Sequence, residues 1–386
     1  MKFLLLFAVS IISMSFIQLN QVLASSHDRS PAIQSESAIL IDAKTGKILF
    51  EKNSDKQMYP ASLTKVATAI YAIEKGNLDD IVTVSQNAIE AEGTRVYLEE
   101  GEQVPLKKLI QGLLINSGND AGVAIAEHLD GSVSVFSENI NEYLKKNIGV
   151  SNTNFENPHG LFNQNHLTTA QDFAKITQYA IQNKTFKEIF GTKELKWKGQ
   201  TWDTTLFNHH KLMREMPYDG VNGGKTGYVD QSGHTLVTTA KRGKLNLIAV
   251  TFKGSSQTAA YSDTVNLLDY GFENYQTSTI AKGKKYEIGD KEFAAPKNLY
   301  YSHPIGSQVT EVMNKNGTLE ILNQDQEVIS EFSLELINKT DELNAVEASI
   351  KSNPVDLENH ISKIIFLSMG LAAGIVGLFY NQVRKI

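Results

Sequence analysis

Three short polar clusters carry the residue types that acyl transfer through an activated serine requires. In chain order they are Ser62-Leu63-Thr64-Lys65, Ser117-Gly118-Asn119 and Lys225-Thr226-Gly227. A serine hydroxyl is a poor nucleophile at neutral pH, so it needs a base within hydrogen-bond reach. On a helix, a lysine three positions after a serine lies one turn away on the same face, so Lys65 can serve Ser62. Each cluster alone is a weak signal, whereas the ordered set predicts a serine acyl-transfer site.

The chemistry gives each reacting group a role. Ser62 is the predicted nucleophile, at a helix start whose unpaired amides and dipole can stabilise an oxyanion. Lys65 is the predicted general base and must be neutral to accept a proton. Its pKa therefore has to fall from about 10.4, through burial or through a neighbouring cation such as Lys225. Ser117 is predicted to relay a proton between Lys65 and the leaving amine.

The remaining groups of the clusters suit substrate binding. Asn119 offers a donor and an acceptor to a substrate amide. Lys225 and Thr226 place a positive charge and a hydroxyl at one strand edge, where a substrate carboxylate can bind. Gly227 lets a substrate backbone lie close to the strand. The ordinary alternatives are an N-terminal capping serine, a polar turn and a solvated hairpin lysine.

Apolar patterns predict the elements that must position these clusters. The runs Ser37–Asp42 and Lys47–Glu51 flank a Gly-containing turn and predict a hairpin at the edge of an antiparallel sheet. After Pro60, apolar residues at helical spacing predict a buried helix that starts at Ser62 and ends at Gly76. These apolar residues are Val66, Ala69, Ile70 and Ile73.

The second cluster lies in a break between two predicted helices, within the segment from Leu106 to Leu129. Asp120 is the predicted N-cap of the second helix. The third cluster precedes two predicted paired strands, Thr235–Thr239 and Leu245–Phe252. A helical segment over Thr258–Tyr270 then completes a predicted α+β domain, and Gly- and Asn-punctuated stretches after about Tyr275 predict a small β-rich domain.

The two ends of the chain predict export and anchoring. The apolar stretch Phe3–Phe16, followed by Val22-Leu23-Ala24, predicts a cleaved signal peptide, with an uncleaved membrane anchor as the alternative. The uncharged run Ile364–Tyr380, followed by basic residues, predicts a C-terminal membrane anchor. Because this run is at the short end of the spanning range, a helix lying in the membrane plane stays open.

These patterns divide the sequence into four predicted parts. They are a signal peptide over 1–24, a catalytic domain over 25–275, a small β-rich domain over 276–352 and a membrane anchor over 361–383. The basic C-terminal tail would stay in the cytoplasm, which places the catalytic domain on the extracytoplasmic side of the cell membrane.

Composition excludes several other classes of function. The chain has no cysteine, which removes disulfides, thiol catalysis and thiolate metal sites. Its formal net charge of −6 argues against a nucleic-acid partner. The nine histidines include no H-E-x-x-H spacing, so we expect neither a metal nor another cofactor.

The sequence resembles the serine-type D-Ala-D-Ala carboxypeptidases, which are low-molecular-mass penicillin-binding proteins of the peptidase S11 type. The likeness is close from about Ser37 to Tyr275. It is carried by the stretches Tyr59-Pro-Ala-Ser-Leu-Thr-Lys65, Ile115-Asn-Ser-Gly-Asn-Asp-Ala121, Phe155-Glu-Asn-Pro-His-Gly-Leu161, Gly223-Gly-Lys-Thr-Gly227 and Leu267-Leu-Asp-Tyr-Gly-Phe272.

The resemblance implies a β-lactamase/penicillin-binding-protein-like transpeptidase fold, with an antiparallel sheet beside a helical lobe. It implies that Ser62 attacks the carbonyl of the penultimate D-alanine in a peptidoglycan stem peptide, that D-alanine leaves, and that water hydrolyses the acyl-enzyme. β-Lactams would acylate the same serine. The backbone amides of Ser62 and Tyr228 would form the oxyanion hole, and His159 would lie in the loop beside the site.

The sequence also departs from the family pattern. Some relatives carry histidine at the position of Tyr228, and the stretch Ala259-Ala260-Tyr261 lacks an arginine expected just before the aromatic residue. His159 has two open roles, placing the deacylating water or making a structural hydrogen bond.

Three alternative functions stay open on the same fold. A β-lactamase would need a carboxylate to activate water, and only Glu156 stands near the corresponding loop. A transpeptidase would use an amine in place of water as the acceptor. A catalytically silent wall-binding protein would retain the fold alone, against which the intact set of clusters argues.

Overall fold

The computed structural model describes residues 30–337. Within these residues the chain forms two compact units. One extends to Ser278 and includes Tyr300–Ser307, and the other comprises Thr279–Leu299 and the segment from Gln308. The predicted signal peptide and membrane anchor lie outside the described residues. Among residues 30–337, no helix is both long and apolar enough to cross a membrane.

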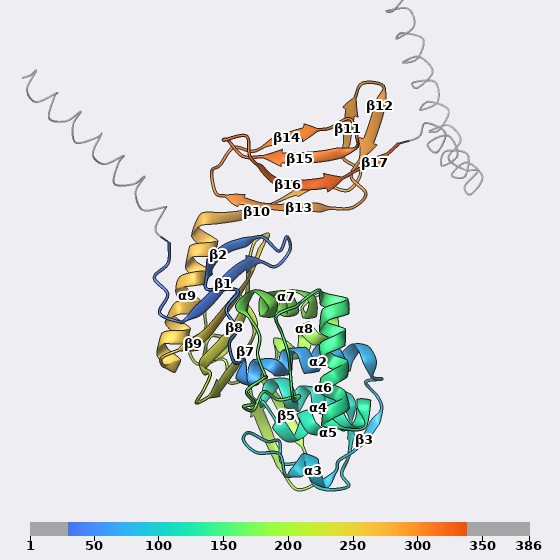
Figure 1. The fold of residues 1–386 in the computed structure, drawn as a ribbon, viewed down its shortest axis with the longest axis vertical. Helices are drawn as coiled ribbons and strands as arrows, with labels where there is room; N and C mark the ends of the chain where they lie inside the picture. Colours follow the sequence, from blue (N-terminus) through green and yellow to red (C-terminus); the bar gives the residue numbers. More distant parts are fainter. Residues whose placement is uncertain (1–29, 338–386) are drawn as a thin grey trace, which may run out of the picture. The chain divides into compact units, whose positions relative to one another are not determined.

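A five-stranded antiparallel sheet with the order β2-β1-β9-β8-β7 forms the centre of the first unit (Figure 1). Its strands are β1 (Ser37–Asp42), β2 (Ile48–Lys52), β7 (Val221–Val229), β8 (Gly233–Arg242) and β9 (Leu245–Gly254). β2 is an edge strand, so the predicted N-terminal hairpin is confirmed. Because helices cover both faces of the sheet, all six residues of β1 are buried.

Alternate residues of β1 face two different cores. Ile39 and Ile41 belong to a large apolar cluster shared with the helices on one face of the sheet. Ala38 and Leu40 pack in a second cluster with residues of α9 (Gln257–Asn274) on the other face. This alternation is the period-2 pattern of a strand. It places the sheet as a layer between several helices on one face and α9 on the other.

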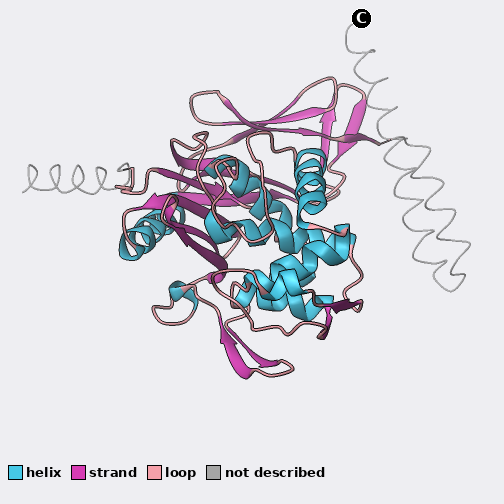
Figure 2. Cartoon of the chain, turned by 60° about the horizontal axis from the view of Figure 1, so that its bottom comes forward, coloured by secondary structure: helices cyan, strands magenta, loops and turns pink. Residues whose placement is uncertain are grey.

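The large cluster is built mainly by helices that lie beside the sheet, and Figure 2 shows them in cyan next to the magenta strands. They are α2 (Thr64–Lys75), α3 (Gln86–Ile89), α4 (Leu106–Ile115), α5 (Asn119–Asp130), α6 (Val133–Tyr143), α7 (Ala170–Ala180) and α8 (Lys184–Phe190). A π-helical turn, η2 (Leu144–Ile148), follows α6. The predicted α+β class is confirmed.

Two short hairpins and two single turns complete the first unit. The hairpins are β3 (Ile81–Thr83) with β4 (Gln103–Pro105) and β5 (Glu194–Lys198) with β6 (Asp203–Phe207), and the turns are the 3-10 segments η1 (Ala61–Leu63) and η3 (Lys211–Met213). The two hairpins were not predicted from the sequence, although Leu195 and Trp197 of β5 alternate with charged residues.

The chain after α9 is β-rich, as predicted. Its strands are β10 (Tyr275–Ile280), β11 (Lys285–Ile288), β12 (Lys291–Ala294), β13 (Leu299–Pro304), β14 (Thr310–Met313), β15 (Thr318–Leu322), β16 (Val328–Ser333) and β17 (Glu335–Leu336). β10 pairs with β13, and two three-stranded antiparallel sheets have the orders β11-β12-β17 and β14-β15-β16. Leu319 and Ile321 of β15 are fully buried.

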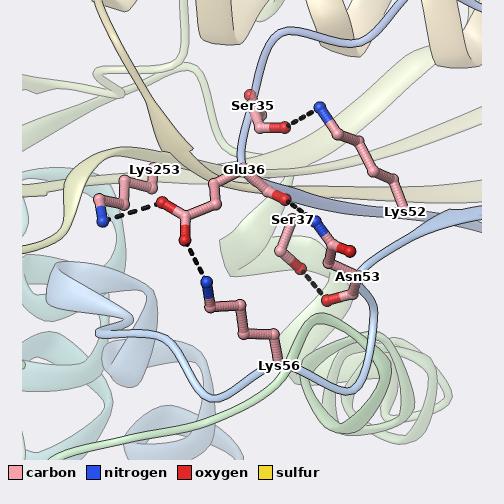
Figure 3. A network of polar contacts seen from close by, with 7 residues as sticks. All are labelled: Ser35, Glu36, Ser37, Lys52, Asn53, Lys56 and Lys253. Atoms are coloured by element: carbon pink, nitrogen blue, oxygen red, sulfur yellow. Dashed lines mark hydrogen bonds and ion pairs between the residues drawn. The ribbon is translucent and has the colours of Figure 1, made fainter.

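A cluster of charged residues holds the chain in place just before β1. Figure 3 shows Glu36 of this cluster between Lys56 and Lys253. The Glu36 carboxylate lies 2.6 Å from Lys56 Nζ and 2.8 Å from Lys253 Nζ. The Glu36 carbonyl accepts a hydrogen bond from Asn53 Nδ2 at 2.8 Å. The cluster thus joins the start of β1 to the loop after β2 and to the end of β9.

Loss of the Glu36 charge is expected to destabilise the fold in a pH-dependent way. Hydrogen bonds from Lys253, which has the largest effect, and from Lys56 lower the pKa of Glu36 from 4.5 to about 2. Since the folded pKa is depressed, this stabilisation is present above about pH 4.5 and is lost as the pH falls toward 2. The ion pairs are partly exposed, so Glu36→Gln should lower the free energy of unfolding at pH 7 by only about 0.5–1 kcal/mol.

Urea unfolding between pH 2 and pH 7 measures this effect. The gap between the wild type and Glu36→Gln should narrow below about pH 4.5 and close near pH 2. Glu138→Gln is the matched control, because Glu138 is exposed on α6 and has no ion pair within residues 30–337. A gap of constant size over the whole range would show that the variant acts through something other than charge.

Candidate functional site

Ser62 and Lys65 are in direct contact. Lys65 Nζ lies 2.8 Å from Ser62 Oγ, and it also donates to the carbonyl oxygen of His159 at 2.6 Å. Ser62 lies in the 3-10 turn η1, and α2 itself begins at Thr64. The predicted helix start is therefore corrected by two residues, because a tight turn precedes the first α-helical hydrogen bonds.

The environment of Lys65 favours the neutral amine. Its side chain is completely buried, and burial is the main reason that its pKa lies well below the usual 10.5. The positive charge of Lys225 lowers this pKa further, while Asp120 opposes the shift. A neutral amine at this distance can take the proton of the Ser62 hydroxyl, so the arrangement can generate an alkoxide-like nucleophile.

Ser117 occupies the turn before α5 with a left-handed backbone, φ 64°. This conformation is costly for a residue with a Cβ and is characteristic of functional sites. Its side chain lines the same cleft as Ser62. Its hydroxyl makes no hydrogen bond within the described residues, so it can bond a bound molecule.

Asn119 is engaged with the cleft wall. Its Nδ2 donates to the Glu92 carbonyl at 2.5 Å, and its backbone amide donates to the Thr94 carbonyl at 2.7 Å. Its Oδ1 is buried and has no partner in the described structure. Thr94 lines the cleft, and so Asn119 supports the wall from behind.

Asp120 is not the N-cap of α5, so that prediction was wrong. Gly118 precedes the helix, and no side-chain bond caps it. The buried Asp120 carboxylate instead accepts the backbone amides of Val96, at 3.0 Å, and Leu98, at 3.2 Å. These amides belong to a loop distant in sequence, which a capping pattern cannot reveal.

The third cluster lies on β7, and Gly227 packs against the turn that carries Ser62. A Cβ on Gly227 would lie 2.9 Å from Ser62 N and 2.4 Å from Thr235 Oγ1. The Thr235 hydroxyl donates to the Pro60 carbonyl at 3.0 Å. Gly227 was predicted to leave room for a substrate backbone. The structure shows that the turn carrying Ser62 itself lies close to this residue, and only glycine fits there.

Lys225 is buried on β7 while Thr226 and Tyr228 line the cleft. Burial lowers the pKa of Lys225 from 10.5 to about 7. Its Nζ donates to the Thr226 carbonyl at 2.8 Å. Lys225 therefore acts on Lys65 through its charge, and its amine lies beside Thr226, which lines the cleft.

His159 contributes its backbone more directly than its ring. Its carbonyl holds Lys65, whereas its Nδ1 accepts the Leu161 amide at 3.2 Å. Burial lowers the pKa of its imidazole to about 3, so the ring is neutral at physiological pH.

The cleft in front of Ser62 has a volume of about 440 Å³, which is in the range of small-molecule sites. It is lined by Ser62, Thr94, Ser117, His209, Thr226, Gly227, Tyr228, His234, Thr235, Leu236, Gln257, Ala260 and Tyr261. Within residues 30–337, no group of His, Asp and Glu side chains could hold a metal ion.

The part of the cleft wall formed by α9 and by the loop that leads through His209 into η3 was not predicted from the sequence. Tyr261 joins the two, since its hydroxyl accepts the Lys211 amide at 2.8 Å and donates to the His209 carbonyl at 3.4 Å. His209 and Gln257 stand in no recognisable motif. The one available signal was the pair His209-His210, whose first member lines the cleft while the second is buried.

Comparison with known proteins agrees with this geometry. The family model of D-alanyl-D-alanine carboxypeptidases, peptidase S11, matches residues 24–256. D-alanyl-D-alanine carboxypeptidase DacF of Bacillus subtilis strain 168 is 35% identical over 65% of this chain and 65% of its own length. DacA of Escherichia coli strain K12 is 31% identical over 80% of this chain and 81% of its own length.

Solved structures show the same fold. Penicillin-binding protein 5 from Haemophilus influenzae superposes with a TM-score of 0.71 at 28% identity, covering 80% of this chain and 98% of that one. A mutant of the Streptomyces K15 DD-transpeptidase has a TM-score of 0.59 at 28% identity, over 63% of this chain and 99% of that one. The chain therefore has the penicillin-binding-protein fold and belongs to the peptidase S11 family of D-alanyl-D-alanine carboxypeptidases.

Proposed function

We propose that this protein is a serine-type D-alanyl-D-alanine carboxypeptidase that removes the terminal D-alanine from peptidoglycan stem pentapeptides through an acyl-enzyme on Ser62. The observation that carries the proposal is the buried Lys65 amine 2.8 Å from the Ser62 hydroxyl at the base of an open cleft. Membership of the peptidase S11 family supports the reaction and the substrate class.

Acylation begins when Ser62 Oγ attacks the carbonyl carbon of the penultimate D-alanine and Lys65 takes the hydroxyl proton. The backbone amides of Ser62 and Tyr228 stabilise the oxyanion that forms on the carbonyl oxygen. The carbon–nitrogen bond then breaks, and the proton passes from Lys65 through Ser117 to the amine of the departing D-alanine.

Deacylation repeats these steps with water in place of Ser62 Oγ. Lys65 is free of the proton again and activates the water that attacks the ester, and the ester oxygen recovers its proton as Ser62 is released. A β-lactam presents a similar carbonyl to Ser62, but its ring-opened product stays attached, which makes β-lactams slow-leaving inhibitors of this cleft.

Substrate binding uses the edge of β7. Lys225 supplies the positive charge and Thr226 the hydroxyl that hold the terminal carboxylate. The substrate backbone extends along the strand beside Gly227, while Asn119 holds the loop that carries Thr94 at the cleft. His159 keeps Lys65 in place through its carbonyl.

The charge of Lys225 predicts an alkaline limit to catalysis. Its pKa of about 7 means that its attraction for a substrate carboxylate weakens as the pH rises through 7 in the free enzyme. Arginine stays charged, so Lys225→Arg should move the alkaline limb of kcat/KM upward by more than about one pH unit.

The pH dependence of kcat/KM between pH 5 and pH 10 measures this shift. The two proteins are compared by the pH at the midpoint of the alkaline limb. The absolute value of kcat/KM is not compared, because the larger guanidinium can also lower the rate. Lys175→Arg, at an exposed position on α7, is the matched control and should leave the profile unchanged. Coincident alkaline limbs in wild type and Lys225→Arg would show that another group sets the limit.

A pentapeptide assay tests the proposed reaction against its alternatives. Mass analysis should show loss of one D-alanine per peptide, with penicillin blocking the release. Cross-linked dimers as the main product in the presence of an amine acceptor would identify a transpeptidase. Penicillin hydrolysed within seconds would identify a β-lactamase, and absence of any turnover would leave a wall-binding protein.

We also propose that the protein acts on the extracytoplasmic side of the cell membrane. The apolar N-terminal stretch supports a signal peptide over residues 1–24, and the uncharged run near the C-terminus supports an anchor over residues 361–383. Removing residues 361–386 should shift the protein from the membrane fraction to the medium or periplasm. Retention in the membrane fraction after that truncation would contradict the anchor.

A further inference from the structure

The residue before the nucleophile has an unfavourable backbone conformation. Ala61 has φ 48° and is almost completely buried. A left-handed conformation is costly for a residue with a Cβ, so the surrounding contacts must hold it in place. Because the Ala61 carbonyl belongs to the peptide unit that supplies the Ser62 amide, the orientation of this peptide fixes where the Ser62 N–H points.

A buried relay holds this peptide through two side chains that do not line the cleft. The Thr64 hydroxyl donates to the Ala61 carbonyl at 2.9 Å. His166 Nε2 lies 2.8 Å from the same hydroxyl oxygen. His166 is 1% exposed and stacks on Phe155 with ring centroids 4.9 Å apart, so its ring is fixed in position as well as in direction.

The hydrogen-bond pattern determines the tautomer of His166. Its Nδ1 accepts the backbone amide of Glu156 at 3.0 Å, so the proton of the neutral ring is on Nε2. Nε2–H therefore donates to Thr64 Oγ1, which directs the Thr64 proton to the Ala61 carbonyl. Burial lowers the pKa of His166 to about 3, which keeps the ring neutral over the working range.

The loop from Phe155 to His166 also packs closely against the Ala61 carbonyl, at Gly160. Gly160 has φ 86°, and a Cβ on it would lie 1.8 Å from Ala61 O and 2.9 Å from Thr64 Oγ1. Its neighbour His159 accepts the hydrogen bond from Lys65. The loop from Phe155 to His166 thus contacts both the turn that carries the nucleophile and the base.

We propose that His166 is a positioning residue for the Ser62 nucleophile, acting through the Thr64 hydroxyl on the Ala61 peptide. The inference rests on the proposed acyl-enzyme at Ser62. The relay sets the direction of the Ser62 amide, which is one donor of the proposed oxyanion hole, so its loss slows the chemical step and leaves substrate binding at β7 intact. A positioning error of this kind can lower a rate by about 100-fold.

Matched pairs of variants separate positioning from a general effect on folding. Thr64→Val removes the hydroxyl at nearly constant volume, whereas Thr64→Ser keeps it. His166→Leu removes both ring nitrogens. His166→Gln keeps a donor toward Thr64 and an acceptor toward Glu156.

The experiment measures the acylation rate constant with penicillin, kcat and KM for a D-Ala-D-Ala peptide, and thermal melting, all with the full-length protein. Thr64→Val and His166→Leu should lower acylation and kcat by about 10- to 100-fold with KM changed less than about threefold. Thr64→Ser and His166→Gln should stay within about threefold of the wild type. The double variant Thr64→Val/His166→Leu should be no slower than the slower single variant, because both changes break one relay.

A folded Thr64→Val that acylates at the wild-type rate would overturn the proposal, and so would His166→Gln that is as slow as His166→Leu. Additive losses in the double variant would assign the two residues to separate roles. If His166→Leu does not fold, the Thr64 pair carries the test alone. A wild-type protein that forms no acyl adduct would overturn the proposed function as well, and so the two failures are distinguishable.

Discussion

Replacing Ser62 with alanine is expected to abolish D-alanine release. The variant lacks the atom that forms the acyl bond, so the residual rate should be at least about 10⁴-fold below the wild type. The variant should also form no covalent adduct with penicillin. Because the cleft keeps its other lining residues, a D-Ala-D-Ala peptide should still bind to it. Release of D-alanine and intact-protein mass after penicillin treatment measure both effects.

The control for this variant is Ser134→Ala, which removes an exposed serine on α6. It should leave both the rate and the adduct unchanged. Thermal melting should confirm that Ser62→Ala is folded, since the Ser62 side chain is only partly buried. D-alanine release by Ser62→Ala at the wild-type rate would place the activity in another part of the protein or in a contaminant.

Replacing Lys65 with methionine is the second substitution with a large expected effect. It removes the base at similar volume, so acylation by penicillin and peptide turnover should each fall by about 10²- to 10⁴-fold. Lys65→Arg should be equally slow, because an arginine stays protonated and cannot accept the Ser62 proton. Stopped-flow acylation at pH 7 measures the loss. Acylation of Lys65→Met at the wild-type rate would show that another group activates the serine.

Lys65→Met should not destabilise the fold. The pKa of Lys65 is lowered in the folded state, mainly by burial, so the unfolded chain binds its proton more readily at pH 7. Folding therefore has to remove that proton or bury its charge, and methionine avoids this cost. Urea unfolding at pH 7 should show Lys65→Met to be at least as stable as the wild type, which separates its loss of activity from any loss of structure.

Apolar patterning was sufficient to predict the elements that carry the clusters. The runs around β1, β2, β8 and β9 alternate or are continuously apolar, and α2 and α9 show helical spacing. Such patterns reflect burial against a core, which is the main determinant of the fold. The ordered clusters also predicted a shared site, and the structure brings Ser62, Ser117 and Thr226 to one cleft.

Polar side chains that bond distant backbone could not be placed in this way. Asp120 and Asn119 stand where a helix start predicts a cap and a substrate contact, yet both hold the loop from Glu92 to Leu98. His166 lies 102 positions from Thr64 along the chain, and only the fold brings the two together. Sequence patterns report local periodicity, whereas these contacts depend on tertiary proximity.

D-alanine release is proposed to proceed through an acyl-enzyme on Ser62, and graded acylation by penicillin measures this dependence. Peptide mapping of the treated protein should find one adduct, on the peptide that contains Ser62, and D-alanine release should fall in proportion to the acylated fraction. Full release from protein whose Ser62 is completely acylated, or an adduct on a different residue, would contradict the account.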